Sequence, residues 1–136
     1  MLFRSPTGVT VGDQFHAGEF LDTLEAAKVN SIAIFAKCHH GYSYFDTKVG
    51  TRHPGLGYDL FGQMVAESAK RKMPVLAYFS LNVDEVFADA HPEYVAQFRD
   101  GKPVNTQILQ DDSELYWRWL CPNRGPWLKK IGRAHV

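Results

Sequence analysis

Polar and aromatic side chains gather directly after the first short apolar run of the chain. Phe35, Lys37 and His39 share one face if the extended backbone continues, and His40 turns with the loop that follows. Lysine only donates hydrogen bonds, whereas histidine donates or accepts them. Aromatic residues come next, at Tyr42, Tyr44 and Phe45. This set suits a sugar, which offers hydroxyl groups and apolar C–H faces. The alternative interpretation is a solvated loop with histidines that only stabilise the fold.

A second group of candidate functional residues lies within and directly after the next apolar run, residues 75–81. A carboxylate at the end of this run, such as Asp84 or Glu85, would bind a hydroxyl group or serve as an acid or base. Alternatively, either residue caps a following helix. Together the two groups give the predicted substrate-binding residues: Lys37, His39, His40, Tyr78, Asn82 and Asp84.

Other chemistries find less support in the sequence. Cys38, His39, His40 and His53 are metal-ligand types, but neighbouring residues on a strand face opposite ways, so the first three cannot reach one ion without a turn. The chain has no Cys-x-x-Cys, Gly-x-Ser-x-Gly or Gly-x-Gly-x-x-Gly pattern. Its two cysteines make no disulfide framework. We therefore predict no metal and no cofactor.

Helices and strands alternate in the pattern that positions these residues. Apolar spacing predicts helices over Ala17–Lys28 and Tyr58–Lys72, and strands over Ser31–Ala36 and Val75–Leu81, with a long loop over 38–57. A helix between two strands makes the strands parallel. Both strands are nearly continuous in hydrophobicity, which predicts burial on both faces. The candidate residues then lie at the carboxyl ends of neighbouring strands, where α/β proteins bind ligands.

The pattern is looser after Asn82. Pro92–Phe98 reads as a short helix that begins at its proline. Asp100-Gly101 predicts a tight turn between residues 94–99 and 103–109.

The composition is that of an ordinary globular domain. Of 136 residues, 45% are hydrophobic and 22% are charged, and 15 basic residues balance 15 acidic ones. Without a basic surplus we expect no nucleic-acid partner, and without an apolar run of about 20 residues we expect no membrane partner. No signal peptide is visible after Met1, which favours the cytoplasm.

The segment AKCHHGYSYFDTKVGTRHPGL, Ala36–Leu56, resembles a family of bacterial proteins called hypothetical glycosyl hydrolase family six. Further matching stretches extend the similarity over most of residues 13–128: the helix from Tyr58, the strand Val75–Asn82, His91–Tyr94 with Asp100–Lys102, and Leu120–Asn123.

Residues 36–42 are also similar to the strand motif Ala-Lys-His-His-Asp-Gly-Phe of α-L-fucosidases, in which the histidine pair contacts the sugar. The similarity is offset, because Cys38 stands at the first histidine position and His40 at the aspartate. Which of His39 and His40 touches a substrate therefore stays open.

The resemblance implies an α/β fold, namely a partial (β/α)₈ TIM barrel with about the first three β/α units, truncated at both ends, since a complete barrel needs about 250 residues. It implies a fragment of a glycoside hydrolase that acts on the O-glycosidic bonds of a carbohydrate. The acid and nucleophile of such enzymes are expected after residue 128. The catalytic residues therefore stay unknown, and we expect the fragment to be inactive alone.

Two other interpretations remain open at this point. The parent protein would be a non-catalytic carbohydrate-binding barrel if its later strands lack paired carboxylates. A structural flavodoxin-like domain would leave the polar loops as plain surface.

The last six residues, IGRAHV, have a separate explanation. A common short-read sequencing adapter encodes this hexapeptide in one frame. We therefore expect residues 1–130 to be the barrel fragment and residues 131–136 to be non-native and to pack on nothing. The parent contig should continue differently after Lys129 or Lys130, and finding IGRAHV in independent clones would refute this expectation.

Overall fold

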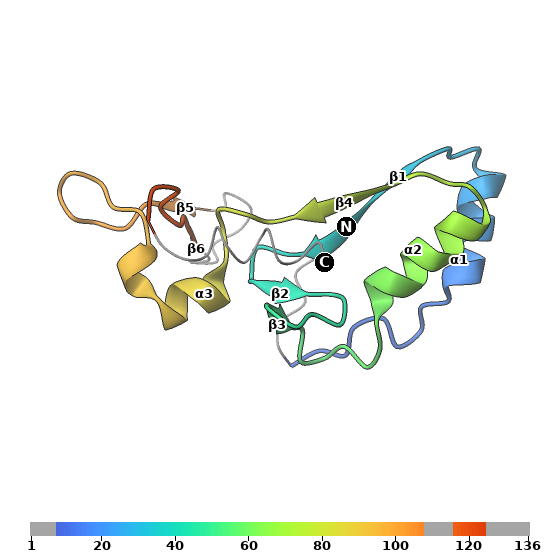
Figure 1. Ribbon diagram of the computed structural model, residues 1–136, viewed down its shortest axis with the longest axis horizontal. Coiled ribbons are helices and arrows are strands. Elements are labelled where there is room, and N and C mark those ends of the chain that lie inside the picture. The colour runs from blue at the N-terminus through green and yellow to red at the C-terminus, as the bar shows by residue number, and fades with distance from the viewer. Residues whose placement is uncertain (1–7, 108–115, 125–136) are drawn as a thin grey trace. The chain divides into compact units, whose positions relative to one another are not determined.

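The computed structural model describes residues 8–107 and 116–124 (Figure 1). The predicted adapter segment 131–136 lies outside these residues. The described chain divides into two compact units. The first holds residues 8–37, Ser43–Asp46 and Arg52–Phe79, and the second holds Cys38–Tyr42, Thr47–Thr51 and the described residues from Ser80 onward.

A four-stranded sheet in the order β3-β2-β1-β4 organises the first unit. β1 (Ile32–Lys37) and β4 (Val75–Phe79) run parallel, so the predicted pairing is confirmed. β2 (Tyr42–Ser43) pairs antiparallel with β1, and β3 (Thr51–Arg52) follows it in the sheet. The sequence predicted only a loop over 38–57, because strands of two residues are too short to show a period of two.

Two helices pack on each other, and the second of them also packs against β1 (Figure 1). α1 spans Ala17–Ala26 and α2 spans Leu60–Lys70, both shorter than predicted. Each helix ends where a lysine turns left-handed, Lys28 with φ 60° and Lys72 with φ 56°. At the start of α2, the side chain of Asp59 accepts a hydrogen bond from the backbone of Gly62.

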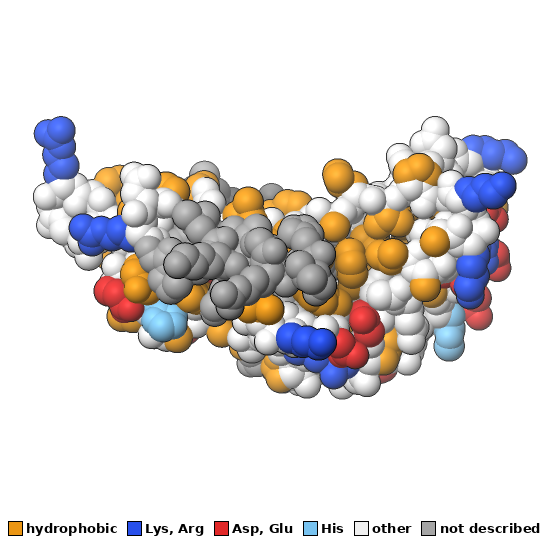
Figure 2. Space-filling model, viewed as in Figure 1, with side chains coloured by type: hydrophobic (Ala, Val, Ile, Leu, Met, Phe, Trp, Pro, Cys, Tyr) orange, Lys and Arg blue, Asp and Glu red, His pale blue; other side chains and the backbone are white. Residues whose placement is uncertain are grey.

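β4 is largely exposed among the described residues. Leu76 is 70% exposed and Tyr78 38%, whereas Ile34 and Leu21 are buried. The prediction of burial on both faces is therefore wrong for β4, because the successive residues Leu76, Ala77 and Tyr78 are all exposed and so leave both of its faces open. Figure 2 shows hydrophobic side chains gathered beside the helices, whose outer edge carries charged side chains.

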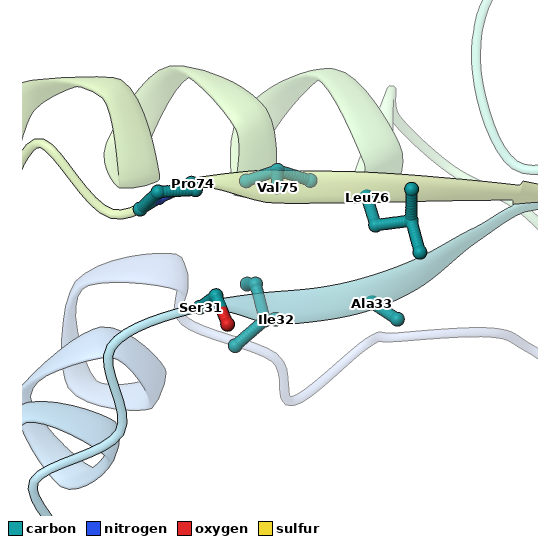
Figure 3. A pocket seen from close by; sticks show the side chains of 6 residues that line it. All are labelled: Ser31, Ile32, Ala33, Pro74, Val75 and Leu76. Atoms are coloured by element: carbon teal, nitrogen blue, oxygen red, sulfur yellow. The ribbon is translucent and has the colours of Figure 1, made fainter.

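A shallow apolar depression lies at the amino ends of β1 and β4, with a volume of about 360 Å³. Figure 3 shows the side chains along it, which come from the two strands and from the residue before each strand: Ser31, Ile32, Ala33, Pro74, Val75 and Leu76.

The second unit contains α3 (Glu85–Ala90), a 3₁₀ turn (Pro92–Tyr94) and a two-stranded antiparallel sheet. The strands are β5 (Asn105–Gln107) and β6 (Tyr116–Arg118). Its core consists of Phe87, Ala88, Val95 and Leu120, with Tyr94 packed against them. No helix in the described part of the chain is long and apolar enough to cross a membrane.

Two predictions for this unit have different outcomes. The turn at Asp100-Gly101 is confirmed, because Gly101 has φ 83° and the backbone of Phe98 donates to the carbonyl of Lys102 at 2.8 Å. The helix predicted from Pro92 to Phe98 is only a 3₁₀ turn that stops at Tyr94. Val95 is extended there, because its backbone joins a bridge to Leu120.

Candidate functional site

A β-bulge changes the direction of side chains at the carboxyl end of β1. Phe35 pairs with Tyr78, but Lys37 pairs with Phe79, so β1 carries one extra residue at this point. The ring centroids of Phe35 and Tyr78 are 4.5 Å apart, whereas Lys37 Nζ lies 5.4 Å from the ring centroid of Phe79. The prediction that Phe35 and Lys37 share a face is therefore wrong, because the bulge breaks the alternation.

Lys37 and Tyr78, the two predicted site residues of the first unit, have different surroundings. The Lys37 side chain is buried, with only 7% of the residue exposed, and lies over an aromatic face. Tyr78 is 38% exposed on β4.

His39 belongs to the second unit and is held by a buried serine. Its Nδ1 lies 2.7 Å from Ser80 Oγ, although 41 positions separate the two residues in the chain. Ser80 Oγ in turn donates to the carbonyl of Val83 at 2.7 Å. This chain of contacts fixes the orientation of the imidazole ring.

Trp117 brings the two histidines into one cluster. Its ring lies edge-on to both imidazoles, with centroids 5.5 Å from His39 and 4.8 Å from His40. His40 Nδ1 also lies 3.8 Å from the sulfur of buried Cys38. All three rings of the cluster are partly exposed. An aromatic face next to two imidazoles provides the groups that a sugar requires, namely hydrogen-bonding nitrogens and an apolar surface.

Asp84 and Glu85 stabilise the start of α3. Asp84 is the N-cap, and its Oδ1 accepts a hydrogen bond from the backbone of Phe87 at 2.8 Å. Glu85 accepts hydrogen bonds from the backbone and the guanidinium of Arg118, each at 2.7 Å. The contacts of Asp84 thus match the alternative interpretation from the sequence, in which this residue caps a helix. Asn82, two positions earlier, is exposed, and its carbonyl oxygen accepts a hydrogen bond from the backbone N–H of Leu120.

The pKa of Arg118, in the second unit, is shifted by its surroundings. Burial lowers the pKa of its guanidinium, but hydrogen bonds and charge attraction from Asp89 and Glu85 outweigh it, so the pKa is raised overall. The guanidinium therefore stays charged and anchors α3 to β6.

The backbone after β1 packs closely on α3. The N–H groups of Glu85 and Val86 donate to the carbonyls of His39 and His40, at 3.2 and 3.0 Å. Gly41 follows with φ 96°, and a side chain there would overlap Asp84. The start of α3 thus packs closely on the histidine loop, residues Cys38–Tyr42.

A metal centre finds no support in the described residues. Among them, no three His, Cys, Asp or Glu side chains come together in a way that would hold an ion.

Residues 16–131 match the family described as hypothetical glycosyl hydrolase 6. The chain belongs to this family. The resemblance predicted from the AKCHHG and LCPN motifs is confirmed. A comparison with curated proteins gave no significant match.

A solved structure adds to the family assignment. The hypothetical glycosyl hydrolase 6 chain is similar to α-L-fucosidase isoenzyme 2 from Paenibacillus thiaminolyticus, with a TM-score of 0.83 and 26% sequence identity. The similarity covers 97% of this chain and 20% of the fucosidase chain. The chain thus spans about a fifth of the length of that structure. Its fold is mixed α/β and similar to part of a fucosidase.

Sequence reasoning missed Trp117, which belongs to the cluster, and Ser80, which contacts His39. Trp117 lies in a stretch that showed no strand pattern, because β6 is only three residues long. Ser80 looked like part of a buried strand, although its hydroxyl contacts two groups. The weak signals were a tryptophan in an aromatic run and a polar residue at the end of an apolar one.

Proposed function

We propose that the chain is the N-terminal part of a (β/α)₈ glycoside hydrolase and supplies sugar-binding side chains to that enzyme. The observation that carries the proposal is the cluster of His39, His40 and Trp117, in a chain of a glycosyl hydrolase family. The parallel β1–β4 pair with α2 between its strands supports the barrel, as does the similarity to part of a fucosidase.

The chemistry of the cluster matches the class of substrate that the family name implies. The imidazole nitrogens bind hydroxyl groups, and the tryptophan lies against the apolar face of the sugar. Bond cleavage in most glycosidases needs two carboxylates that flank the glycosidic oxygen. Because Asp84 caps a helix and Glu85 binds Arg118, we assign the acid and the nucleophile to later strands of the complete enzyme.

Substitution of the two histidines in the complete enzyme tests this proposal. His39→Ala and His40→Ala should each weaken sugar binding by roughly 5- to 150-fold, since a hydrogen bond lost to a buried hydroxyl costs about 1–3 kcal/mol. The melting temperature should change far less. Trp117→Ala should also weaken binding, through the loss of an apolar contact surface.

The exposed His16, which precedes α1 and makes no capping bond with its side chain, provides the matched control. His16→Ala should leave both binding and melting unchanged. If His39→Ala and His40→Ala bind sugar normally but melt much earlier, the histidines are structural and the proposal fails.

A non-catalytic carbohydrate-binding protein is the second candidate. The engagement of Asp84 and Glu85 in structural bonds favours a purely binding role for this part of the chain. Turnover of aryl glycosides by the complete protein separates the two candidates, because a binding protein would retain the sugar without cleaving it.

A further inference from the structure

Glu85, the first residue of α3, is bonded to both segments that form the histidine–tryptophan cluster. Its backbone N–H donates to the carbonyl of His39 at 3.2 Å. Its carboxylate accepts hydrogen bonds from the backbone N–H and from Nε of Arg118, each at 2.7 Å. Arg118 directly follows Trp117 on β6. Glu85 therefore joins the loop that carries the histidines to the strand that carries the tryptophan.

The carboxylate of Glu85 lies at the outer edge of β6. Backbone N–H groups of successive strand residues point to opposite sides, and the N–H of Trp119 donates to the carbonyl of Val104, next to β5, at 3.0 Å. The N–H of Arg118 thus points away from β5 and toward Glu85. Because three paired residues hold a two-stranded sheet only weakly, a bond to the free edge of β6 should fix where its side chains lie.

Asp89 binds the same arginine in a different way. It stands four positions after Glu85, so the two carboxylates share one face of α3. Among the described residues, Asp89 contacts Arg118 through the guanidinium and not through the backbone. The Glu85 side chain is 20% exposed and the Asp89 side chain 73%, so water competes less for the bonds of Glu85.

We propose that Glu85 is a positioning residue whose carboxylate holds β6 so that Trp117 lies against the two histidines. That this arrangement serves a sugar rests on the proposed function. Glu85 then acts on a substrate through Trp117 and not by touching it.

Fluorine spectroscopy of the full chain tests the position of Trp117 without any ligand. The chain carries 5-fluorotryptophan at its three tryptophans and is kept in solution by a carrier protein without tryptophan. Trp117→Phe assigns the signal. Because the ring centroids of His40 and Trp117 are 4.8 Å apart, the imidazole shifts this signal, and His40→Ala should move it. We expect Glu85→Ala to move the Trp117 signal most of the way to that of the unfolded chain.

Matched variants separate the reach of the Glu85 side chain from its charge. Glu85→Gln removes the charge but keeps an oxygen that accepts from the backbone of Arg118, so it should preserve the Trp117 signal. Glu85→Asp keeps the charge but is one methylene group shorter, so it should move the signal. Asp89→Ala removes the other carboxylate on Arg118 and should leave the signal in place. If Glu85→Ala does not fold, the opposite results for glutamine and aspartate still decide.

Sugar binding by the complete enzyme tests whether Glu85 acts through Trp117. Glu85→Ala should weaken binding roughly fivefold or more at a temperature well below melting. In a Trp117→Ala background the same substitution should weaken binding no further, because the side chain that Glu85 positions is gone. A residue that touches the sugar itself would add its own loss.

The outcomes separate this proposal from the proposed function. A Trp117 signal that Glu85→Ala and Glu85→Asp leave in place, or that Asp89→Ala moves as far, refutes the positioning role whatever the sugar binding. Losses of binding that add in the double variant also refute it. If the Trp117 signal depends on Glu85 but Trp117→Ala binds sugar normally, the positioning is confirmed and the sugar contact of Trp117 is refuted.

Discussion

At the residue scale, two glycines with the same backbone preference differ in what surrounds them. Gly41 has φ 96° and Gly101 has φ 83°, values that side chains of L-residues rarely adopt. A Cβ on Gly41 would overlap the carboxylate of Asp84, whereas a Cβ on Gly101 would meet nothing within 4 Å. Gly41 therefore differs from Gly101 in the closeness of Asp84 and not in its backbone conformation.

Alanine at these two positions should therefore have unequal effects. Gly101→Ala should cost about 1–2 kcal/mol of stability from backbone strain alone. Gly41→Ala should cost about 1–3 kcal/mol more, because the added methyl group displaces Asp84. Urea unfolding of the soluble fraction measures both. Equal losses would mean that Asp84 does not pack on the loop as described.

At the element scale, α3 depends on a single capping side chain that is also a candidate site residue. Asp84 caps the helix, and α3 is only six residues long, so its own hydrogen bonds contribute little. The two roles of Asp84 are separable, because asparagine caps a helix about as well as aspartate does.

Asp84→Ala should cost about 0.5–2 kcal/mol of stability, and Asp84→Asn only a few tenths. Sugar binding by the Asp84→Asn variant of the complete enzyme then decides the second role. Loss of binding at unchanged stability would assign the carboxylate to the substrate. Normal binding would leave Asp84 as a cap alone and remove it from the predicted site.

A charged network joins the two helices of the first unit. Arg71, directly after α2, binds Asp22 and Glu25 of α1 and Glu67 of α2. Hydrogen bonds from Lys70 and Arg71 hold the pKa of Glu67 below its ordinary value of 4.5. A carboxylate with a lowered folded-state pKa stabilises the fold above its unfolded pKa, and this contribution is lost as the pH falls through the folded value.

Glu67→Gln should therefore lower the melting temperature at about pH 7, and the difference from the unmodified chain should shrink toward zero near about pH 3. Added salt should also reduce the difference, since the pairs lie at the surface. Glu19→Gln is the control variant. It removes a carboxylate of α1 and measures how much the loss of one negative charge changes the melting temperature by itself. A constant difference between about pH 7 and pH 3 would contradict the ionic role of Glu67.

At the scale of the whole molecule, β4 has one neighbouring strand in the described sheet and three successive exposed residues, Leu76 to Tyr78. β1 pairs with it on one side, and Leu76 is 70% exposed. A strand at the edge of a sheet with exposed apolar side chains favours association with other chains. In the barrel that we propose, a further strand and the barrel interior would cover both.

We therefore expect residues 1–130 alone to be poorly soluble and catalytically silent. An assay of aryl glycoside hydrolysis tests this expectation. It compares the soluble fraction of the fragment with the complete protein. Turnover by a soluble monomeric fragment, above the background of an Asp84→Asn, Glu85→Gln double variant, would overturn the barrel-fragment interpretation. It would also move the catalytic carboxylates to Asp84 and Glu85.

Matched substitutions test the physical reason for the low solubility. Leu76→Thr should raise the soluble yield, because it introduces a β-branched residue that suits a strand and removes exposed apolar surface. Ile34→Thr, at a buried position of β1, should lower it by destabilising the fold. If both substitutions act in the same direction, the exposed apolar surface of β4 is not the cause.

Sequence alone determined the alternation of helices and strands in the first unit, and with it the parallel pairing of β1 and β4. Apolar periodicity carries this information because each element must bury a stripe or a face of its own. The family followed from contiguous motifs for the same reason, since AKCHHG and LCPN are local strings. The turn at Gly101 was equally local.

Only the tertiary structure decided which side chains meet. The contact of His39 with Ser80 spans 41 positions, and Trp117 contacts both histidines from β6, which lies far along the chain from them. The bulge that turns Lys37 toward Phe79 likewise depends on the register between two strands. Pattern along the chain reports how each element buries its own surface, but contacts between distant residues depend on how those elements pack.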